Sequence, residues 1–230
     1  MNYIGAMNQS LVISKAAAEK SGVKADAPTA QRLKALKGMT IAITKPGAMT
    51  DIHMRFLLQM AGLEPSDVKL VAIGAPQAMI SAVEAGSIDG FVISLGPDRT
   101  AVARGAVMWI DNLRGIPGLS PFPMVSLYTM QSYAEKNPDV VRRVVRATQR
   151  ATKEMSERSV DDIMTVLKPR YASMDPNVLR LCIEAFKPSL NVSGAVTREM
   201  AQNVLDFMPE AKGITVDQYL SFYTGRFLKD

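Results

Sequence analysis

The chain has 230 residues, with 27 Lys and Arg against 22 Asp and Glu, and its formal net charge is +5. Hydrophobic residues make up 47% and charged residues 21%, which excludes a disordered chain because enough apolar surface is available to offset the entropy lost on folding. A single Cys, Cys182, excludes an intrachain disulfide and a cysteine metal site, and a single His, His53, excludes paired-histidine zinc motifs.

At the start of the chain, residues 7–14 are expected to form a strand fragment. Residues 15–37 are polar and rich in alanine, with a helix expected at 29–36. The first eight residues lack the basic start and long apolar core of a signal peptide, so that, taken literally, the chain stays in the cytoplasm. No apolar stretch approaches the roughly 18 residues needed to cross a membrane.

Between residues 39 and 128, short β-branched runs alternate with helical segments. Strands are expected at 40–44, 68–73, 90–94 and 107–111. Strands that alternate with helices of this length predict right-handed βαβ crossovers and a mostly parallel sheet. Residues 113–123 carry three Pro and two Gly and are expected to form a loop, which one more strand follows at 124–130.

Beyond residue 133 the sequence predicts helices only. They are expected at 133–156, 159–168, 175–187, 197–208 and 215–228. In the first of these, Arg142, Arg146 and Arg150 recur every four residues opposite an apolar stripe, which indicates the solvated face of an amphipathic helix. Because no aromatic residue lies within this basic run, nucleic-acid binding is not expected.

Three of the expected strands end in loops that contain Gly or Pro, at residues 45–47, 74–76 and 96–97. In a parallel sheet such loops share one edge, and ligands bind in the crevice outside it. Gly47 and Thr50 stand at the start of a helix, where free backbone N–H groups and the helix dipole favour an anion. The alternative is that Thr50 only caps the helix and Gly47 only forms a turn. The glycine spacing matches neither a Rossmann fingerprint nor a P-loop.

Catalytic interpretations find little support in the sequence. His53 has no nucleophile elbow and no second His to work with, which favours a structural role. Cys182 lies on an apolar helix face and is expected to be a buried, inert thiol. The 15 Met residues are interpreted as packing. No catalytic residue, metal site or cofactor is therefore expected.

Six segments stand in a fixed order along the chain, at residues 36–44, 46–51, 57–63, 65–74, 79–90 and 138–151. The first reads Leu-Lys-Gly-Met-Thr-Ile-Ala-Ile-Thr, and the fifth ends in Ala-Gly-Ser-Ile-Asp-Gly. Together they resemble the type II periplasmic solute-binding proteins of ABC importers, in particular the subgroup that serves nitrate, sulfonates, taurine and thiamine precursors. The resemblance covers about residues 5–155 and is fairly specific because the whole set is in order.

The resemblance implies an α/β fold with two lobes, a parallel-rich sheet flanked by helices, and a helical C-terminal half. Residues 1–37 are then a remnant of lobe 1 and its crossover. Residues 38–125 form lobe 2, and residues 126–230 form the return strand and the C-terminal helices that pack on lobe 1. The resemblance also implies that the signal peptide and the opening strands of lobe 1 are missing, through a misplaced start or a true truncation.

The same resemblance implies which residues contact a ligand. They belong to the loop after the first α/β strand, to the loop after the third, and to a segment near the hinge. The expected ligand-binding residues are Asn8, Gln9, Thr44, Gly47, Ala48, Met49, Thr50, Ser94, Leu95 and Gly96. The Glu-Pro pair usual in the second loop is replaced by Gly96-Pro97, which makes a neutral or anionic ligand more plausible than a cationic one.

The implied function is that of the substrate-binding component of an ABC-type importer, which binds a small organic solute, expected to be anionic, without turnover. The implied partners are the solute and an ABC permease and ATPase, and the implied location is the periplasm. A homo-oligomer is possible if a second copy completes lobe 1. Two alternatives remain open. One is an enzyme on the same scaffold, similar to the thiamine-pyrimidine synthase, whose Cys-rich iron segment this sequence lacks. The other is the ligand-sensing domain of a regulator.

Overall fold

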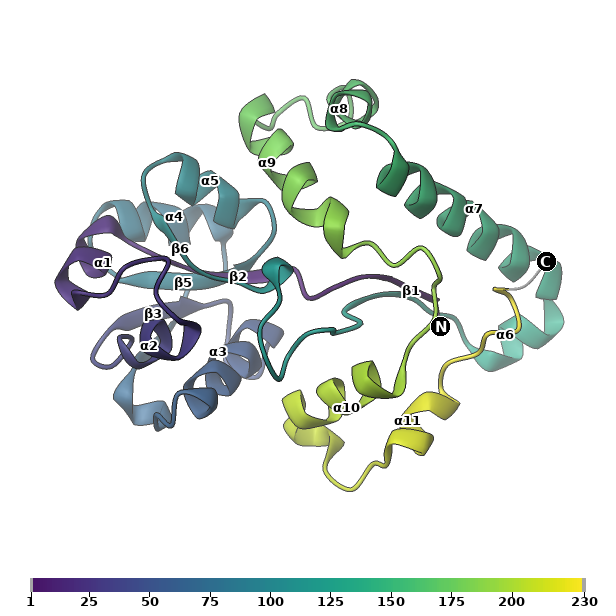
Figure 1. Cartoon of the computed structure of the whole chain (residues 1–230), viewed down its shortest axis with the longest axis horizontal. Helices are drawn as coiled ribbons and strands as arrows, with labels where there is room; N and C mark the ends of the chain where they lie inside the picture. The colour runs from purple at the N-terminus through teal and green to yellow at the C-terminus, as the bar shows by residue number, and fades with distance from the viewer. Residues whose placement is uncertain (1, 229–230) are drawn as a thin grey trace. The chain divides into compact units, whose positions relative to one another are not determined.

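The computed structural model describes residues 2–228 (Figure 1). The chain divides into two compact units. Residues 9–116 form one, which we call the sheet unit, and residues 1–8 with 117–230 form the other, which we call the helical unit. Residues 9–37 thus belong to the same unit as the strands that follow them, whereas the sequence assigned them to lobe 1. The division into two ligand-binding lobes remains a prediction.

The sheet unit contains one five-stranded sheet in the order β4-β3-β5-β2-β6. Its strands are β2 (Gln9–Ile13), β3 (Thr40–Ile43), β4 (Lys69–Ala72), β5 (Gly90–Ser94) and β6 (Val107–Asp111). β3 pairs in parallel with β4 and with β5. β2 runs antiparallel to both of its neighbours, β5 and β6. Because the other four strands share one direction, the α/β fold with a parallel-rich sheet is confirmed.

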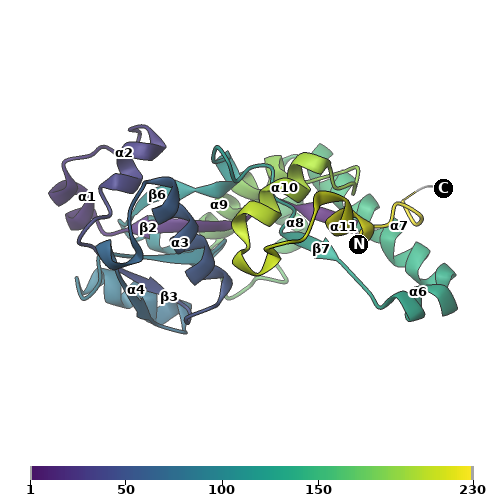
Figure 2. The same ribbon diagram turned by 90° about the horizontal axis from the view of Figure 1, so that it is seen from below.

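Helices cover both faces of this sheet. They are α1 (Lys15–Ser21), α2 (Thr29–Lys34), α3 (Met49–Met60), α4 (Pro76–Glu84) and α5 (Pro97–Ala103), with 3-10 turns η1 (Pro65–Asp67) and η2 (Asn112–Arg114). Figure 1 shows α4 and α5 on one side of the strands and α2 and α3 on the other, and α3 lies in front of the strands in Figure 2. The sheet is therefore a buried middle layer, which explains its nearly continuous apolar strands.

The core of the sheet unit follows the alternation of the strands. Val12 and Phe91, which are register partners on β2 and β5, pack with Met79 of α4 and Ala101 of α5. Successive strand residues point to opposite faces, so Val92 is directed to the side of α2 and α3. All of these side chains are at most 2% exposed.

The helical unit contains a two-stranded antiparallel sheet of β1 (Asn2–Gly5) and β7 (Val125–Leu127). Its helices are α6 (Gln131–Lys136), α7 (Pro138–Glu157), α8 (Val160–Leu167), α9 (Pro176–Phe186), α10 (Arg198–Phe207) and α11 (Val216–Ser221), with 3-10 turns η3 (Lys187–Ser189) and η4 (Pro209–Ala211). Phe122 meets Phe207 of α10 edge to face, with ring centroids 5.0 Å apart. None of the helices in residues 2–228 has both the length and the hydropathy of a membrane span.

Some expected elements differ from those observed. The helix expected at 133–156 is split, because Pro138 has no N–H to continue a helix and Asn137 takes φ −130° and ψ 49°. The helix expected at 215–228 ends at Ser221. The strand at Asn2–Gly5 was not expected, because it is too short to show a pattern. Ser14 caps α1 by accepting a hydrogen bond from the N–H of Ala17, 3.0 Å away, in a segment expected only to be rich in alanine.

Candidate functional site

The connections of the sheet diverge between β3 and β5. β3 leads through α3 to β4 at one edge of the sheet, whereas β5 leads through α5 to β6 on the other side. β3 and β5 are neighbours and run parallel, so the loops that follow them leave the sheet side by side. In open α/β sheets the crevice at such a point of divergence is where ligands bind. The residues at these two carboxyl ends are therefore the candidate site.

Two threonines are joined across the first of these loops. The Thr44 N–H donates to Oγ1 of Thr50 over 3.0 Å, and the two hydroxyl oxygens lie 2.8 Å apart. Thr50 is only 3% exposed, whereas Thr44 is half-buried. Because Thr50 Oγ1 accepts from the backbone, its own proton can donate to Thr44, which leaves the Thr44 proton free to donate outward.

Asp51 bonds to the backbone amide of Gly47, the turn residue before α3. Its Oδ2 accepts from the N–H of Gly47 over 2.8 Å, and its Oδ1 accepts from Nε of Arg55 over 2.8 Å. Gly47 has φ +73°, a conformation that only glycine adopts easily. The N–H of Gly47 is therefore not available to a ligand, because a carboxylate of the protein itself already fills that position.

The start of α3 also differs from the expected cap. Ala48 is the N-cap residue and makes no side-chain cap hydrogen bond, so the alternative that Thr50 caps the helix is wrong. The Ala48 carbonyl accepts from the N–H groups of Asp51 and Ile52. Within residues 2–228, the N–H groups of Met49 and Thr50 have no hydrogen-bond partner, as first-turn amides normally lack one inside the helix. These two amides can receive a ligand.

The second loop is held in a similar way. Gly96, with φ +115°, donates its N–H to Oδ1 of Asp98 over 2.9 Å. Asp98 is completely buried, and burial raises the pKa of its carboxyl although Arg99 lies beside it. Arg99 connects this carboxylate, 3.4 Å away, to Asp111 at the end of β6, 2.8 Å away. A buried ionic network therefore fixes the loop.

Gln9 and Ser94 are direct register partners on β2 and β5, at the same edge as the two loops. Gln9 is 3% exposed, and within the described residues its Oε1 atom has no hydrogen-bond partner. Ser94 and Leu95 are half-buried. A buried amide oxygen without a partner is costly, and a bound donor would relieve that cost. Asn8 belongs to the helical unit, so the sheet unit alone brings together the other nine expected ligand-binding residues.

His53 and the acidic residues offer little for catalysis or metal binding. His53 is fully buried, burial lowers its pKa to about 4, and the side-chain N–H of Asn112 donates to its Nε2. Among residues 2–228, no group of three or more His, Cys, Asp or Glu side chains is placed to hold a metal ion. Sequence reasoning found the loops but missed the roles of Asp51, Asp98 and Arg99, because these depend on side-chain contacts that leave no local pattern.

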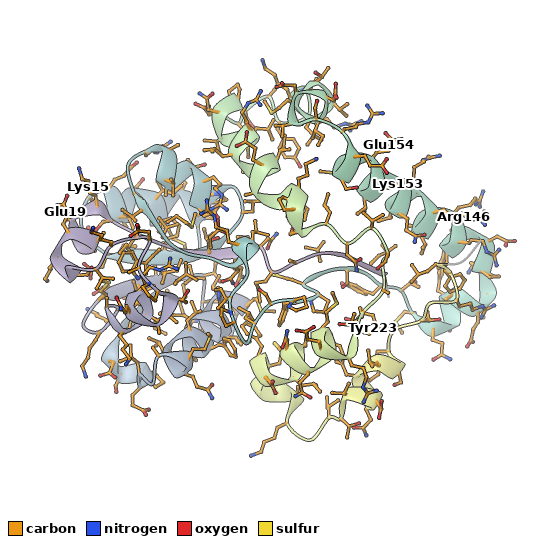
Figure 3. The ribbon with its side chains drawn as sticks, viewed as in Figure 1. Lys15, Glu19, Arg146, Lys153, Glu154 and Tyr223 are labelled. Atoms are coloured by element: carbon orange, nitrogen blue, oxygen red, sulfur yellow. The ribbon has the colours of Figure 1, made fainter. Side chains whose placement is uncertain are left out.

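A groove of about 560 Å³ lies elsewhere, on the helical unit. Exposed basic residues of α7 line it, together with Val192 and Leu228. Figure 3 shows two of them, Arg146 and Lys153, on α7. This agrees with the expected basic face of an amphipathic helix. The sheet edge is the better candidate site because hydrogen-bonding groups from three strands and two loops converge there, whereas the basic residues of the groove come from one helix.

The NMT1-like family matches residues 6–166, which is well over half of the sequence. The chain belongs to the NMT1-like family. A relative with a curated description is the nitrate import ATP-binding protein NrtC of Synechococcus elongatus, 32% identical over 148 residues. This match covers 63% of the present chain but only 21% of NrtC, so the NMT1-like chain spans about a fifth of that protein.

Solved structures share the fold. The periplasmic aliphatic sulphonate binding protein SsuA of Escherichia coli matches with a TM-score of 0.68 at 16% identity, over 99% of this chain and 75% of SsuA. The periplasmic nitrate-binding protein NrtA of Synechocystis PCC 6803 matches with a TM-score of 0.61 at 14% identity, over 94% and 62% of the two chains. The desulfurization enzyme DSZB also matches, with a TM-score of 0.57 at 13% identity over 98% and 76%. The NMT1-like chain therefore has the fold of periplasmic binding proteins, which an enzyme shares.

Proposed function

We propose that this NMT1-like protein is the substrate-binding component of an ABC-type importer and that it binds a small organic anion without turnover. The observation that carries the proposal is that the loops after β3 and β5 leave the sheet side by side and bring hydroxyls and backbone amides to one edge. Relatives of the same family or fold include a nitrate import protein and binding proteins for nitrate and sulphonates, which supports the solute class.

Recognition at this edge would use neutral donors. The Thr44 hydroxyl and the N–H groups of Met49 and Thr50 can donate to ligand oxygens, and the positive end of the α3 dipole favours their negative charge. Gln9 can accept from a donor on the ligand with its partnerless Oε1. Hydroxyl and N–H donors attract an anion less strongly than the charged side chain of a lysine or arginine would. The ligand can therefore dissociate again, as transport requires.

Binding without turnover also fits the side chains near the edge. His53, the single histidine, lies on α3, but its ring is buried and its pKa is lowered to about 4, so the imidazole is uncharged near neutral pH and is shielded from a ligand. The carboxyl groups of Asp51 and Asp98 are already held by glycine N–H groups and arginine side chains, which leaves hydroxyls and backbone amides as the groups that can meet a ligand. A periplasmic location and an ABC permease and ATPase as partners belong to the same proposal, supported by the fold shared with SsuA and NrtA.

Calorimetric titration and thermal denaturation of the 230-residue chain with nitrate, alkanesulfonates and short carboxylates test the proposal. A true ligand present at a hundred times its Kd should stabilise the folded state by about 2.7 kcal/mol. The same panel is applied to Thr44→Val, which removes the outward hydroxyl but keeps the shape of the side chain. We expect binding by the natural chain and much weaker binding by the variant. No heat and no stabilisation with any member of the panel would overturn the proposal.

The fold shared with the enzyme DSZB supports one further candidate function, an enzyme on the same scaffold. Any ligand found by titration should therefore be incubated with the protein and recovered for mass spectrometry. The importer function predicts that the ligand returns unchanged. A product formed in proportion to protein and time would favour the enzyme.

A further inference from the structure

The two loops of the candidate site carry the same unusual arrangement. In each, a glycine with positive φ gives its N–H to an aspartate of the helix that follows, and an arginine close in sequence neutralises that aspartate. The first set is Gly47, Asp51 and Arg55, and the second is Gly96, Asp98 and Arg99. The same edge of the sheet thus receives two carboxylates of the protein itself.

Both carboxylates are shielded from water. Asp51 is 4% exposed and Asp98 is 0% exposed, so solvent screens their charge much less than it screens a surface carboxylate. The neutralisation is uneven, however. Arg55 is half exposed to solvent, and Arg99 is shared between Asp98 and Asp111. A ligand in the crevice would therefore still experience negative potential from both aspartates.

We propose that Asp51 and Asp98 set the charge preference of the site, admitting a neutral or singly charged head group and rejecting a doubly charged anion. The inference rests on the proposed function, because it concerns the same crevice. Its physical basis is that repulsion from a fixed carboxylate doubles when the ligand charge doubles. The attraction of the α3 terminus doubles as well, but that terminus offers only about half a positive charge against two carboxylates.

Three small sulfur compounds of similar shape separate the effect of ligand charge on affinity from the effect of ligand size. Dimethyl sulfone is neutral, methanesulfonate carries one negative charge, and sulfate carries two. Calorimetric titrations of all three compounds in one buffer at a single pH compare their affinities directly. We expect the natural chain to bind methanesulfonate or dimethyl sulfone at least about tenfold more tightly than sulfate.

Asparagine variants test the role of each carboxylate. Asp51→Asn and Asp98→Asn keep an oxygen that can accept the glycine N–H, so they remove charge and preserve the loop. In each variant we expect the ratio of methanesulfonate affinity to sulfate affinity to fall several-fold, while the affinity for dimethyl sulfone stays unchanged. Asp67→Asn is the matched control, because Asp67 pairs with Lys37 at 3.0 Å and precedes β4, at the opposite end of the parallel strands. Asp67→Asn should leave the ratio of methanesulfonate affinity to sulfate affinity unchanged.

The outcomes separate the two proposals. If the natural chain binds sulfate as tightly as methanesulfonate, or if neither asparagine variant changes their ratio, the charge preference is overturned while the binding function stands. An equal change in Asp67→Asn would also overturn it, because the effect would then come from net charge rather than from position. If neither the natural chain nor any variant binds these compounds or the wider panel, the binding function fails, and the charge preference fails with it.

Discussion

Asn112 donates its side-chain N–H to Nε2 of His53 over 2.8 Å, which ties η2, the turn after β6, to α3 inside the sheet unit. His53 is 0% exposed and Asn112 is 2% exposed. The bond needs an unprotonated Nε2 as its acceptor. A proton on this nitrogen would place two donors against each other in a buried space, so the fold of the sheet unit depends on a neutral histidine.

The first prediction concerns stability at acidic pH. Burial lowers the pKa of His53 from 6.5 to about 4, so between these values the unfolded chain binds a proton that the folded chain does not. Stability is therefore expected to fall as pH drops through this window, by about 3 kcal/mol in total. Urea denaturation at a series of pH values measures it. In His53→Gln this part of the pH dependence should disappear, and an unchanged slope would contradict the prediction.

The second prediction concerns the ionic network behind the Gly96 loop. Arg99→Met would leave Asp98 without a cation and Asp111 with only the exposed Arg114, and should destabilise the sheet unit by about 3–5 kcal/mol. Arg114→Met is the matched control. Its side chain is 87% exposed and 3.6 Å from Asp111, so urea denaturation should detect little change.

The pH dependence of this network has the opposite sign to that of His53. Burial raises the pKa of Asp98 above 3.8, so the folded chain keeps a proton that the unfolded chain releases. The stability that the protonated Asp98 carboxyl contributes is therefore lost as the pH rises from 3.8 through the pKa of the folded chain. In Arg99→Met the loss on raising the pH should be larger than in the natural chain, and an equal loss would show that Arg99 does not stabilise the ionised carboxylate.

The third prediction concerns Gly90, the first residue of β5. A Cβ at this position would lie 2.4 Å from the carbonyl oxygen of Val12 and 2.8 Å from a side-chain carbon of Ile13, both on the paired strand β2. Because backbone cannot move aside as a flexible side chain can, Gly90→Ala should cost about 1–3 kcal/mol or more in unfolding free energy. At Gly74, whose Cβ would meet only ordinary contact at 3.9 Å, alanine should change stability far less.

The fourth prediction concerns Thr50 at the candidate site. Thr50→Val keeps the shape of the side chain but leaves the Thr44 N–H without its acceptor, at a cost of about 1–3 kcal/mol. Thr50→Ser restores the hydroxyl and should recover most of the stability. Chemical denaturation of both variants separates the hydrogen bond from packing. Equal losses would show that the methyl group, and not the hydroxyl, supports the loop.

The fifth prediction uses Trp109, the single tryptophan of the chain. It is 0% exposed, and its Nε1–H donates to the Arg32 carbonyl over 2.8 Å while the Arg32 guanidinium donates back to the Trp109 carbonyl. Iodide should therefore quench its fluorescence much less in the folded chain than in urea. The signal reports the sheet unit, whereas far-ultraviolet circular dichroism reports the helices of both units. Quenching as strong in the folded chain as in urea would contradict the burial.

The architecture of the sheet unit could be predicted from the sequence because its signals are local. Apolar runs bounded by Gly and Pro marked β3, β4, β5 and β6 to within a few residues. The antiparallel course of β2 between β5 and β6 could not be predicted, because the pairing of strands distant in sequence leaves no local pattern.

The candidate loops were predicted, but the state of their amides was not. Gly47 was recognised as a turn before a helix, which is a local feature. That Asp51 folds back to accept its N–H depends on side-chain geometry, and Asp51 is equally compatible with an ordinary acidic residue in a first turn. The role of Arg99 depends on Asp111, which lies on another strand, so composition and spacing could not reveal it.

β2 also determines how the chain bears tension. The chain passes from the helical unit into the sheet unit at residues 8 and 9, directly into a strand that is bonded on both sides. A force along β2 would act on all of its hydrogen bonds to β5 and β6 at the same time, instead of breaking them one after another. The second passage, at residues 116 and 117, begins in a loop beyond η2 without such an anchor. Single-molecule stretching should find the first junction much the stronger of the two.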